Sequence, residues 1–189
     1  MNTKLFVAAV AFAAVVATPA NANSVSGPRV EAVIGWDSVS LESQGDDSAS
    51  GMAYGFGAGY DLAVGGRSAI GIDVEGTNST SGWNYREDGV RSSLDLTRDL
   101  YVGARFTTQV AQDVALYAKV GYTNLGLKLR DKEGNTTTTT TAHADGVRGA
   151  LGAQYQLNGG AYLGAEYRYS NYEANISRNQ VVGTLGWRF

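Results

Sequence analysis

The chain has 189 residues, a formal net charge of −3, 25 glycines, 11 tyrosines, two prolines and no cysteine. This length suits a single domain, and the lack of cysteine excludes a fold held together by disulfides. No basic cluster of the kind that binds nucleic acid is present, so we expect no nucleic-acid partner. Abundant glycine and tyrosine with so little proline are typical of an all-β protein.

Residues 1–22 have the pattern of a secretory signal peptide. Lys4 supplies the positive charge, an apolar run follows, and Ala20 and Ala22 are the small residues of a cleavage site. We expect cleavage before Asn23, which leaves residues 23–189 as the one structural domain. A membrane anchor is the alternative, but the apolar run of 13 residues is shorter than the ~20 residues that a spanning helix needs.

The rest of the chain alternates between apolar residues and polar or small ones. In the stretch 52–62, Gly55, Gly57 and Gly59 share one face of a strand, opposite bulky apolar residues. Their even spacing differs from that of a phosphate-binding glycine loop. Eight such segments are found, at residues 30–37, 52–62, 69–77, 94–106, 114–122, 147–155, 161–169 and 180–189.

The segment 94–106 is expected to place Leu94, Leu96 and Leu100 on its apolar face. Arg98 interrupts that face, which indicates a bulge or a position near the rim of the sheet. Short and long connections alternate between the eight segments, as in an up-and-down outer-membrane barrel with short periplasmic turns and long extracellular loops. The sequence therefore predicts an all-β fold, an eight-stranded antiparallel up-and-down transmembrane β-barrel.

Aromatic residues on the apolar faces sort to the strand ends, as interfacial girdles do. The expected periplasmic girdle consists of Tyr60, Phe106, Tyr155 and Phe189, and the outer girdle of Trp36, Tyr54, Tyr122 and Tyr169. A soluble lipocalin-like barrel would place its apolar face inside. Alternation alone does not separate these two barrels, whereas the girdles favour the membrane protein.

The polar faces carry charges of both signs, which should form a lumen network because buried charges must be paired. Its expected members are Glu31, Asp73, Glu75, Asp95, Asp99, Arg105, Lys119, Arg148, Glu166, Arg168 and Arg188. Glu31 and Arg188 are predicted to pair across the seam where the barrel closes. Such a network suits a structural plug, and an ion or proton path is the alternative. The three glycines at 55–59 would leave space for these long side chains.

The residues Gly149–Tyr155 and Glu166–Tyr169 resemble the late strands of small OmpA-like, opacity-protein-like outer-membrane β-barrels of the porin-like superfamily. The ending LGWRF resembles the signal that the barrel-assembly machinery recognises, with Leu185, Trp187 and Phe189 as its apolar residues. The resemblance implies a protein of the Gram-negative bacterial outer membrane, surrounded by lipid and lipopolysaccharide. Family members are variously structural, adhesive, antigenic or porin-like.

Catalysis is not expected. His143 is the only histidine and has no serine close by in the sequence, so it lacks the partners of a catalytic base. The acidic pairs at 46–47 and 87–88 lack the spacing of a calcium loop. We therefore predict no catalytic residue, metal or cofactor.

The long connections are the candidate contact regions. Trp83 and Tyr85 are possible anchors for a host or matrix ligand, or they extend a strand above the membrane. The threonine run 136–141 is read as a flexible, solvated tip. We expect an integral outer-membrane protein with a structural and surface-interaction, adhesin-like or antigen-like role and a plugged lumen. A small pore for ions or solutes is the alternative.

Overall fold

The computed structural model describes residues 25–41, 48–87, 90–133, 136–173 and 175–189. They form antiparallel strands β1 (Gly27–Leu41), β2 (Ser48–Ala63), β3 (Ser68–Ser79), β4 (Gly82–Glu87), β5 (Val90–Gln109), β6 (Val114–Glu133), β7 (Thr136–Gln156), β8 (Ala161–Tyr172) and β9 (Ile176–Arg188). A short 3₁₀ turn, η1 (Asn158–Gly160), joins β7 to β8. No helix among the described residues has the length and hydropathy to cross a membrane.

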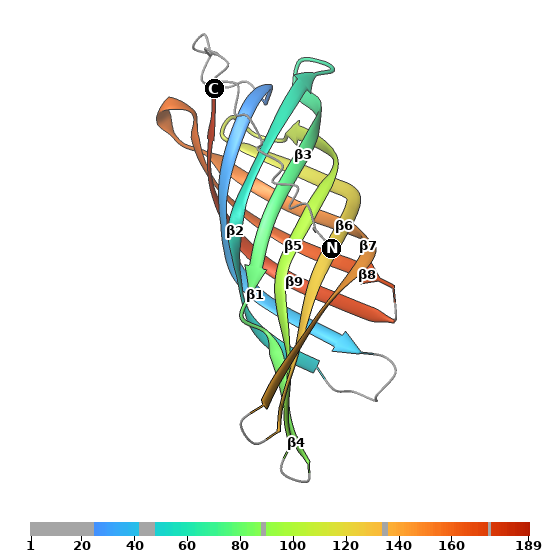
Figure 1. The fold of residues 1–189 in the computed structure, drawn as a ribbon. Coiled ribbons are helices and arrows are strands. Elements are labelled where there is room, and N and C mark those ends of the chain that lie inside the picture. Colours follow the sequence, from blue (N-terminus) through green and yellow to red (C-terminus); the bar gives the residue numbers. More distant parts are fainter. Residues whose placement is uncertain (1–24, 42–47, 88–89, 134–135, 174) are drawn as a thin grey trace, which may run out of the picture.

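The nine strands form a closed barrel of eight transmembrane strands (Figure 1). Strands β3 and β4 pair with successive parts of β5, so they are two segments of one barrel strand, separated at Thr80 and Ser81. Pairing of β1 with β9 closes the barrel at the chain ends. The predicted eight-stranded antiparallel up-and-down barrel is confirmed.

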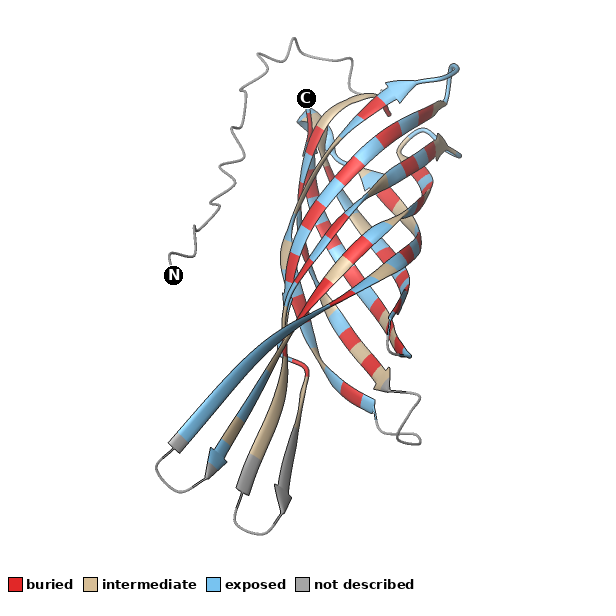
Figure 2. Cartoon of the chain, turned by 45° about the vertical axis from the view of Figure 1, so that its right-hand side comes forward, coloured by how far each residue is buried: buried red, intermediate tan, exposed pale blue. Residues whose placement is uncertain are grey.

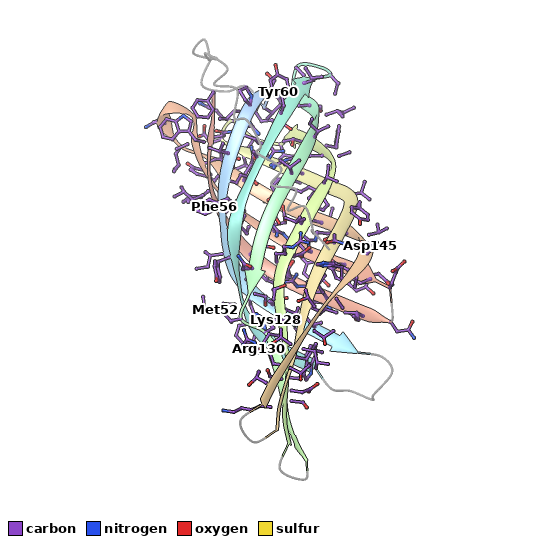
Figure 3. All side chains as sticks on the ribbon, viewed as in Figure 1. Met52, Phe56, Tyr60, Lys128, Arg130 and Asp145 are labelled. Atoms are coloured by element: carbon purple, nitrogen blue, oxygen red, sulfur yellow. The ribbon has the colours of Figure 1, made fainter. Side chains whose placement is uncertain are left out.

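The two faces of each strand differ as the alternation predicts. On β1, Glu31 and Val33 are buried inside the barrel, whereas Ile34 and Trp36 are exposed on its outer surface. Burial alternates in this way along the barrel wall (Figure 2). Side chains such as Phe56 and Tyr60 of β2 project outward from the wall (Figure 3). All eight aromatic residues of the two expected girdles are exposed on this outer surface.

Two long hairpins extend the barrel wall at the end opposite the C-terminus (Figures 1 and 2). Strands β5, β6 and β7 have 20, 20 and 21 residues, about twice the ~10 residues of a transmembrane strand. The outer parts 82–87, 90–96, 125–133 and 136–144 pair side by side as a four-stranded sheet, here called the protruding sheet. The threonine run 136–141 is therefore part of a strand and not the expected flexible tip, because β-branched side chains favour extended backbone.

A β-bulge in β5 marks the point where the protruding sheet leaves the barrel. Leu96 pairs with Leu127 and Asp99 pairs with Leu125, so β5 has one residue more than β6 in this interval. An extra residue reverses which face the following side chains occupy. Leu96 is consequently buried inside and not on the outer surface, and the interruption at Arg98 is explained.

Candidate functional site

The lumen contains a continuous chain of buried ion pairs, here called the lumen network. In the part nearest the protruding sheet, Arg178 donates two hydrogen bonds of 2.7 Å to Asp37 and one of 2.5 Å to Asp99. Arg148 also contacts Asp99, and its Nη1 donates to Glu75 at 3.3 Å. The Asp99 carboxylate thus serves two arginines from different strands, and Asp37 and Glu75 supply the further negative charge that these arginines need.

The rest of the lumen network continues from Glu75 toward the end of the barrel that holds the C-terminus. Arg168 binds Glu75 in a bidentate pair of 2.6 and 2.7 Å and also contacts Glu166. Lys119 lies 2.9 Å from Glu166 and 3.7 Å from Glu31. Closer to the C-terminal end, Arg29 contacts three carboxylates, those of Glu31, Asp61 and Asp73. Arg105 also donates to Glu31, and Arg188 donates to Asp61.

The network is balanced in charge. Its seven basic members are Arg29, Arg105, Lys119, Arg148, Arg168, Arg178 and Arg188, and its seven acidic members are Glu31, Asp37, Asp61, Asp73, Glu75, Asp99 and Glu166; all are buried. Ten of the eleven residues expected from the sequence lie in it. Pairing of this kind offsets the large desolvation cost of buried ions.

Two expectations about individual charges are wrong. Glu31 and Arg188 do not pair: Glu31 is bound by cations of β1, β5 and β6, and Arg188 by Asp61. Asp95 lies outside the lumen, where its half-exposed carboxylate is 3.5 Å from Arg130. The bulge in β5 turns Asp95 to the outer face.

Four network members were missed in the sequence: Arg29, Asp37, Asp61 and Arg178. Arg29 is two residues before Glu31, and Arg178 is two residues before Gln180, so both are in phase with the lumen face. Extending two of the alternating segments by one period would have found Arg29 and Arg178, because the strands are longer than the apolar stretches that identify them. Asp37 and Asp61 already lie within the segments 30–37 and 52–62, in phase with their lumen faces.

Buried tyrosines fill the lumen beside glycines. The ring of Tyr117 lies over Gly152, where an added Cβ would be 2.3 Å from the ring, and the ring of Tyr162 lies over Gly186 in the same way. The Tyr117 ring also stacks on the Arg105 guanidinium at 3.8 Å. Gly59 leaves room for Arg29 itself, since a Cβ would be 2.5 Å from Nη2.

Apolar side chains, here called the mouth cluster, pack together at the end of the barrel where the protruding sheet begins. Its buried members are Val39, Leu96, Leu125, Ala144, Tyr172 and Ile176, and Trp83 and Leu127 pack against them. These residues come from β1, β4, β5, β6, β7, β8 and β9. A barrel lumen is expected to be polar, so this apolar cluster could not be predicted from the alternating pattern. Trp83 lies here as a packed strand residue, and the side chain of Tyr85 lies outside the described residues.

The outer face of the protruding sheet carries a row of basic residues on β6, here called the basic row. Lys128, Arg130 and Lys132 follow Tyr122 of the outer girdle on the same face. Arg130 and Lys132 are exposed, and Lys128 is partly exposed. Figure 3 labels Lys128 and Arg130 of this row. Of these three, Arg130 has an ion pair, with Asp95.

The other predicted residues are placed as follows. His143 is exposed on the outer part of β7, and Leu185, Trp187 and Phe189 are exposed on the outer surface at the C-terminus. Ala20, Ala22, Asn23 and residues 46–47 and 88 lie outside the described residues. Among the described residues, no group of side chains is arranged to hold a metal ion. That the protein is not an enzyme stays a prediction.

A family model described as the outer membrane protein beta-barrel domain matches residues 6–189. The chain belongs to this family. No curated protein matches the chain. Membership places the protein in the bacterial outer membrane, and it confirms the resemblance drawn from the late strands and the C-terminal residues.

Solved structures of surface proteins share the family's fold. The attachment invasion locus protein Ail of Yersinia pestis is 14% identical, with 87% of this chain and 99% of Ail covered and a TM-score of 0.56. Neisserial surface protein A is 17% identical, with 87% and 98% covered and a TM-score of 0.58. A second Ail structure is a complex with the heparin analogue sucrose octasulfate. It is 14% identical, with 86% of this chain and 99% of Ail covered and a TM-score of 0.55. At these identities the likeness shows the fold alone.

Proposed function

We propose that this outer-membrane protein is a surface-interaction protein, adhesin-like in role, with a closed lumen that serves structure. The protruding sheet is the part that meets molecules outside the cell. The observation that carries this proposal is the mouth cluster, because Leu96, Leu125 and Ala144 fix the base of three of the sheet's four strands. A rigid support of this kind reduces the entropy that a binding surface loses when it engages a partner.

The basic row suggests the chemistry of a ligand. Three cations at alternate positions of one strand present their charges to one side, about 7 Å apart along β6. Such a row suits a polyanion with closely spaced sulfate or phosphate groups. Binding of a heparin analogue by Ail supports this chemistry by analogy. We therefore propose a sulfated polysaccharide of a host or matrix surface as the ligand.

The proposal also includes the other partners expected from the sequence. The outer band of aliphatic and aromatic side chains suits outer-membrane lipid and lipopolysaccharide. The exposed Leu185, Trp187 and Phe189 would provide the signal read by the barrel-assembly machinery, and residues 1–22 the cleaved export signal. No pore is proposed, because the lumen network and the mouth cluster fill the path that a solute would take.

The ligand class is tested by titrating sucrose octasulfate into the refolded chain 23–189 in detergent micelles, measured by calorimetry. The triple variant Lys128→Gln, Arg130→Gln, Lys132→Gln should bind at least about tenfold more weakly, and wild-type binding should weaken as salt screens the charges. Arg67→Gln is the matched control, since Arg67 is exposed in the turn between β2 and β3 at the opposite end. Equal binding by wild type and the triple variant would contradict the proposed ligand class.

A further inference from the structure

The outer part of β7 is a strand with one unpaired edge. Residues 136–144 pair with β6, whereas pairing with β8 begins only at Gly146 and Tyr172. Thr137 to His143 are all exposed, on both faces of the strand (Figure 2). Along this stretch, no described residue pairs with the second edge. A free edge presents unpaired N–H and C=O groups to solvent and can accept another strand.

One backbone hydrogen bond identifies which residues present these groups. The N–H of Glu173 donates to the carbonyl oxygen of Asp145 at 2.8 Å, so the backbone polar groups of Asp145 point away from β6. Alternate residues of an antiparallel strand point their backbone groups to the same side, and the β6–β7 register has no shift. The free edge therefore consists of the N–H and C=O groups of Thr137, Thr139, Thr141 and His143.

This edge lacks the features that normally protect exposed strands. Charged side chains, proline, bulges or a very short strand usually block edge pairing, but residues 137–142 are five threonines and an alanine. Threonine has a high preference for extended backbone. The adjacent Ala144 and Leu125 are buried in the mouth cluster, which holds the base of this edge in place.

The composition of the edge determines what it can recognise. A one-residue slip normally moves every side chain to the other face of a sheet, but consecutive threonines look the same after such a slip. An incoming strand is therefore recognised through its backbone and tolerated in several registers. On the outer face, Thr139 is the cross-strand neighbour of Arg130 and Thr141 that of Lys128, which favours acidic side chains at alternate positions of the incoming strand.

We propose that the edge of β7 at 137–143 binds an extended polypeptide segment of another protein by β-strand addition. The preferred segment carries acidic residues at every second position and no proline. This inference rests on the proposed surface role of the protruding sheet. It concerns the backbone edge of β7, whereas the polysaccharide proposal concerns the side chains of the basic row.

The test uses a fluorescein-labelled ten-residue peptide of alternating threonine and glutamate, with binding to the refolded chain 23–189 measured by fluorescence polarisation. Thr139→Pro removes an edge N–H without removing a hydrogen bond to β6, and proline is tolerated at such edge positions. Thr139→Val is the matched control because it keeps the N–H and changes only the hydroxyl. We expect Thr139→Pro to weaken binding by about tenfold or more and Thr139→Val to bind like wild type.

Heat-modifiable migration on gels checks that each variant is folded. Equal binding by wild type and Thr139→Pro would overturn the inference, as would an equal loss in Thr139→Val, which would mean recognition of the hydroxyl. Oligomers of the wild type that dissociate in Thr139→Pro would also overturn it, because a second copy of the chain would then occupy the edge. Binding of sucrose octasulfate to Thr139→Pro shows separately whether the basic row acts as proposed.

Discussion

Replacement of Asp99 by asparagine tests whether the lumen network stabilises the barrel. The Asp99 carboxylate is fully buried and contacts Arg148, Arg178 and the hydroxyl of Thr123. The amide is nearly the same size but neutral, so both buried guanidinium groups lose a charged partner. Removal of one partner from a buried ion pair costs about 3–5 kcal/mol. We expect a loss of this size in the free energy of unfolding.

The assay is equilibrium urea unfolding of the refolded chain 23–189 in lipid vesicles, followed by tryptophan fluorescence. Asp95→Asn is the matched control on the same strand, because the Asp95 side chain is 41% exposed and pairs with a 49% exposed Arg130. Exposed pairs contribute ~0–1 kcal/mol. Similar losses in the two variants, or a loss below about 1 kcal/mol in Asp99→Asn, would refute the claim that burial makes the network strong.

Two further predictions concern the filling of the lumen. Gly152→Ala should destabilise the barrel by about 1–3 kcal/mol, because the new methyl group would overlap the ring of Tyr117; Gly149→Ala, with no atom within 4 Å of its added Cβ, should be nearly neutral in the same urea assay. Refolded protein in a planar bilayer should show no reproducible single-channel steps, and steps whose size changes in Lys119→Gln would contradict the closed lumen.

The barrel could be predicted from the sequence because the two faces of its wall meet very different environments, lipid on the outside and a polar lumen on the inside. Lipid requires apolar side chains at every second position, and the lumen at this strand number admits only side chains that fill it. Ile34 and Trp36 on one face of β1 and Glu31 on the other follow directly from this contrast. Such a pattern is local, so eight strands and their outward faces can be read without any tertiary information.

The partners within the lumen could not be predicted in the same way. Arg29 and Arg188 are Cα neighbours across β1 and β9, yet each arginine reaches a carboxylate on another strand, Asp61 of β2. Long side chains cross the lumen, so which residues pair depends on the register of all eight barrel strands. The expectation that Glu31 and Arg188 meet rested only on their position near the same end of the two strands that close the barrel.

The bulge in β5 accounts for most of what the sequence concealed at the outer end. On its barrel side Asp99 faces inward, and on its outer side Leu96 faces inward. The same strand therefore presents an ion partner to the lumen network and, three residues away, an apolar side chain to the mouth cluster. Without the extra residue, Asp95 would face the interior of the mouth and Leu96 would face outward. The bulge thus allows the protruding sheet, with its own small apolar core, to continue directly from the lipid-facing barrel. The free edge of β7 belongs to this sheet.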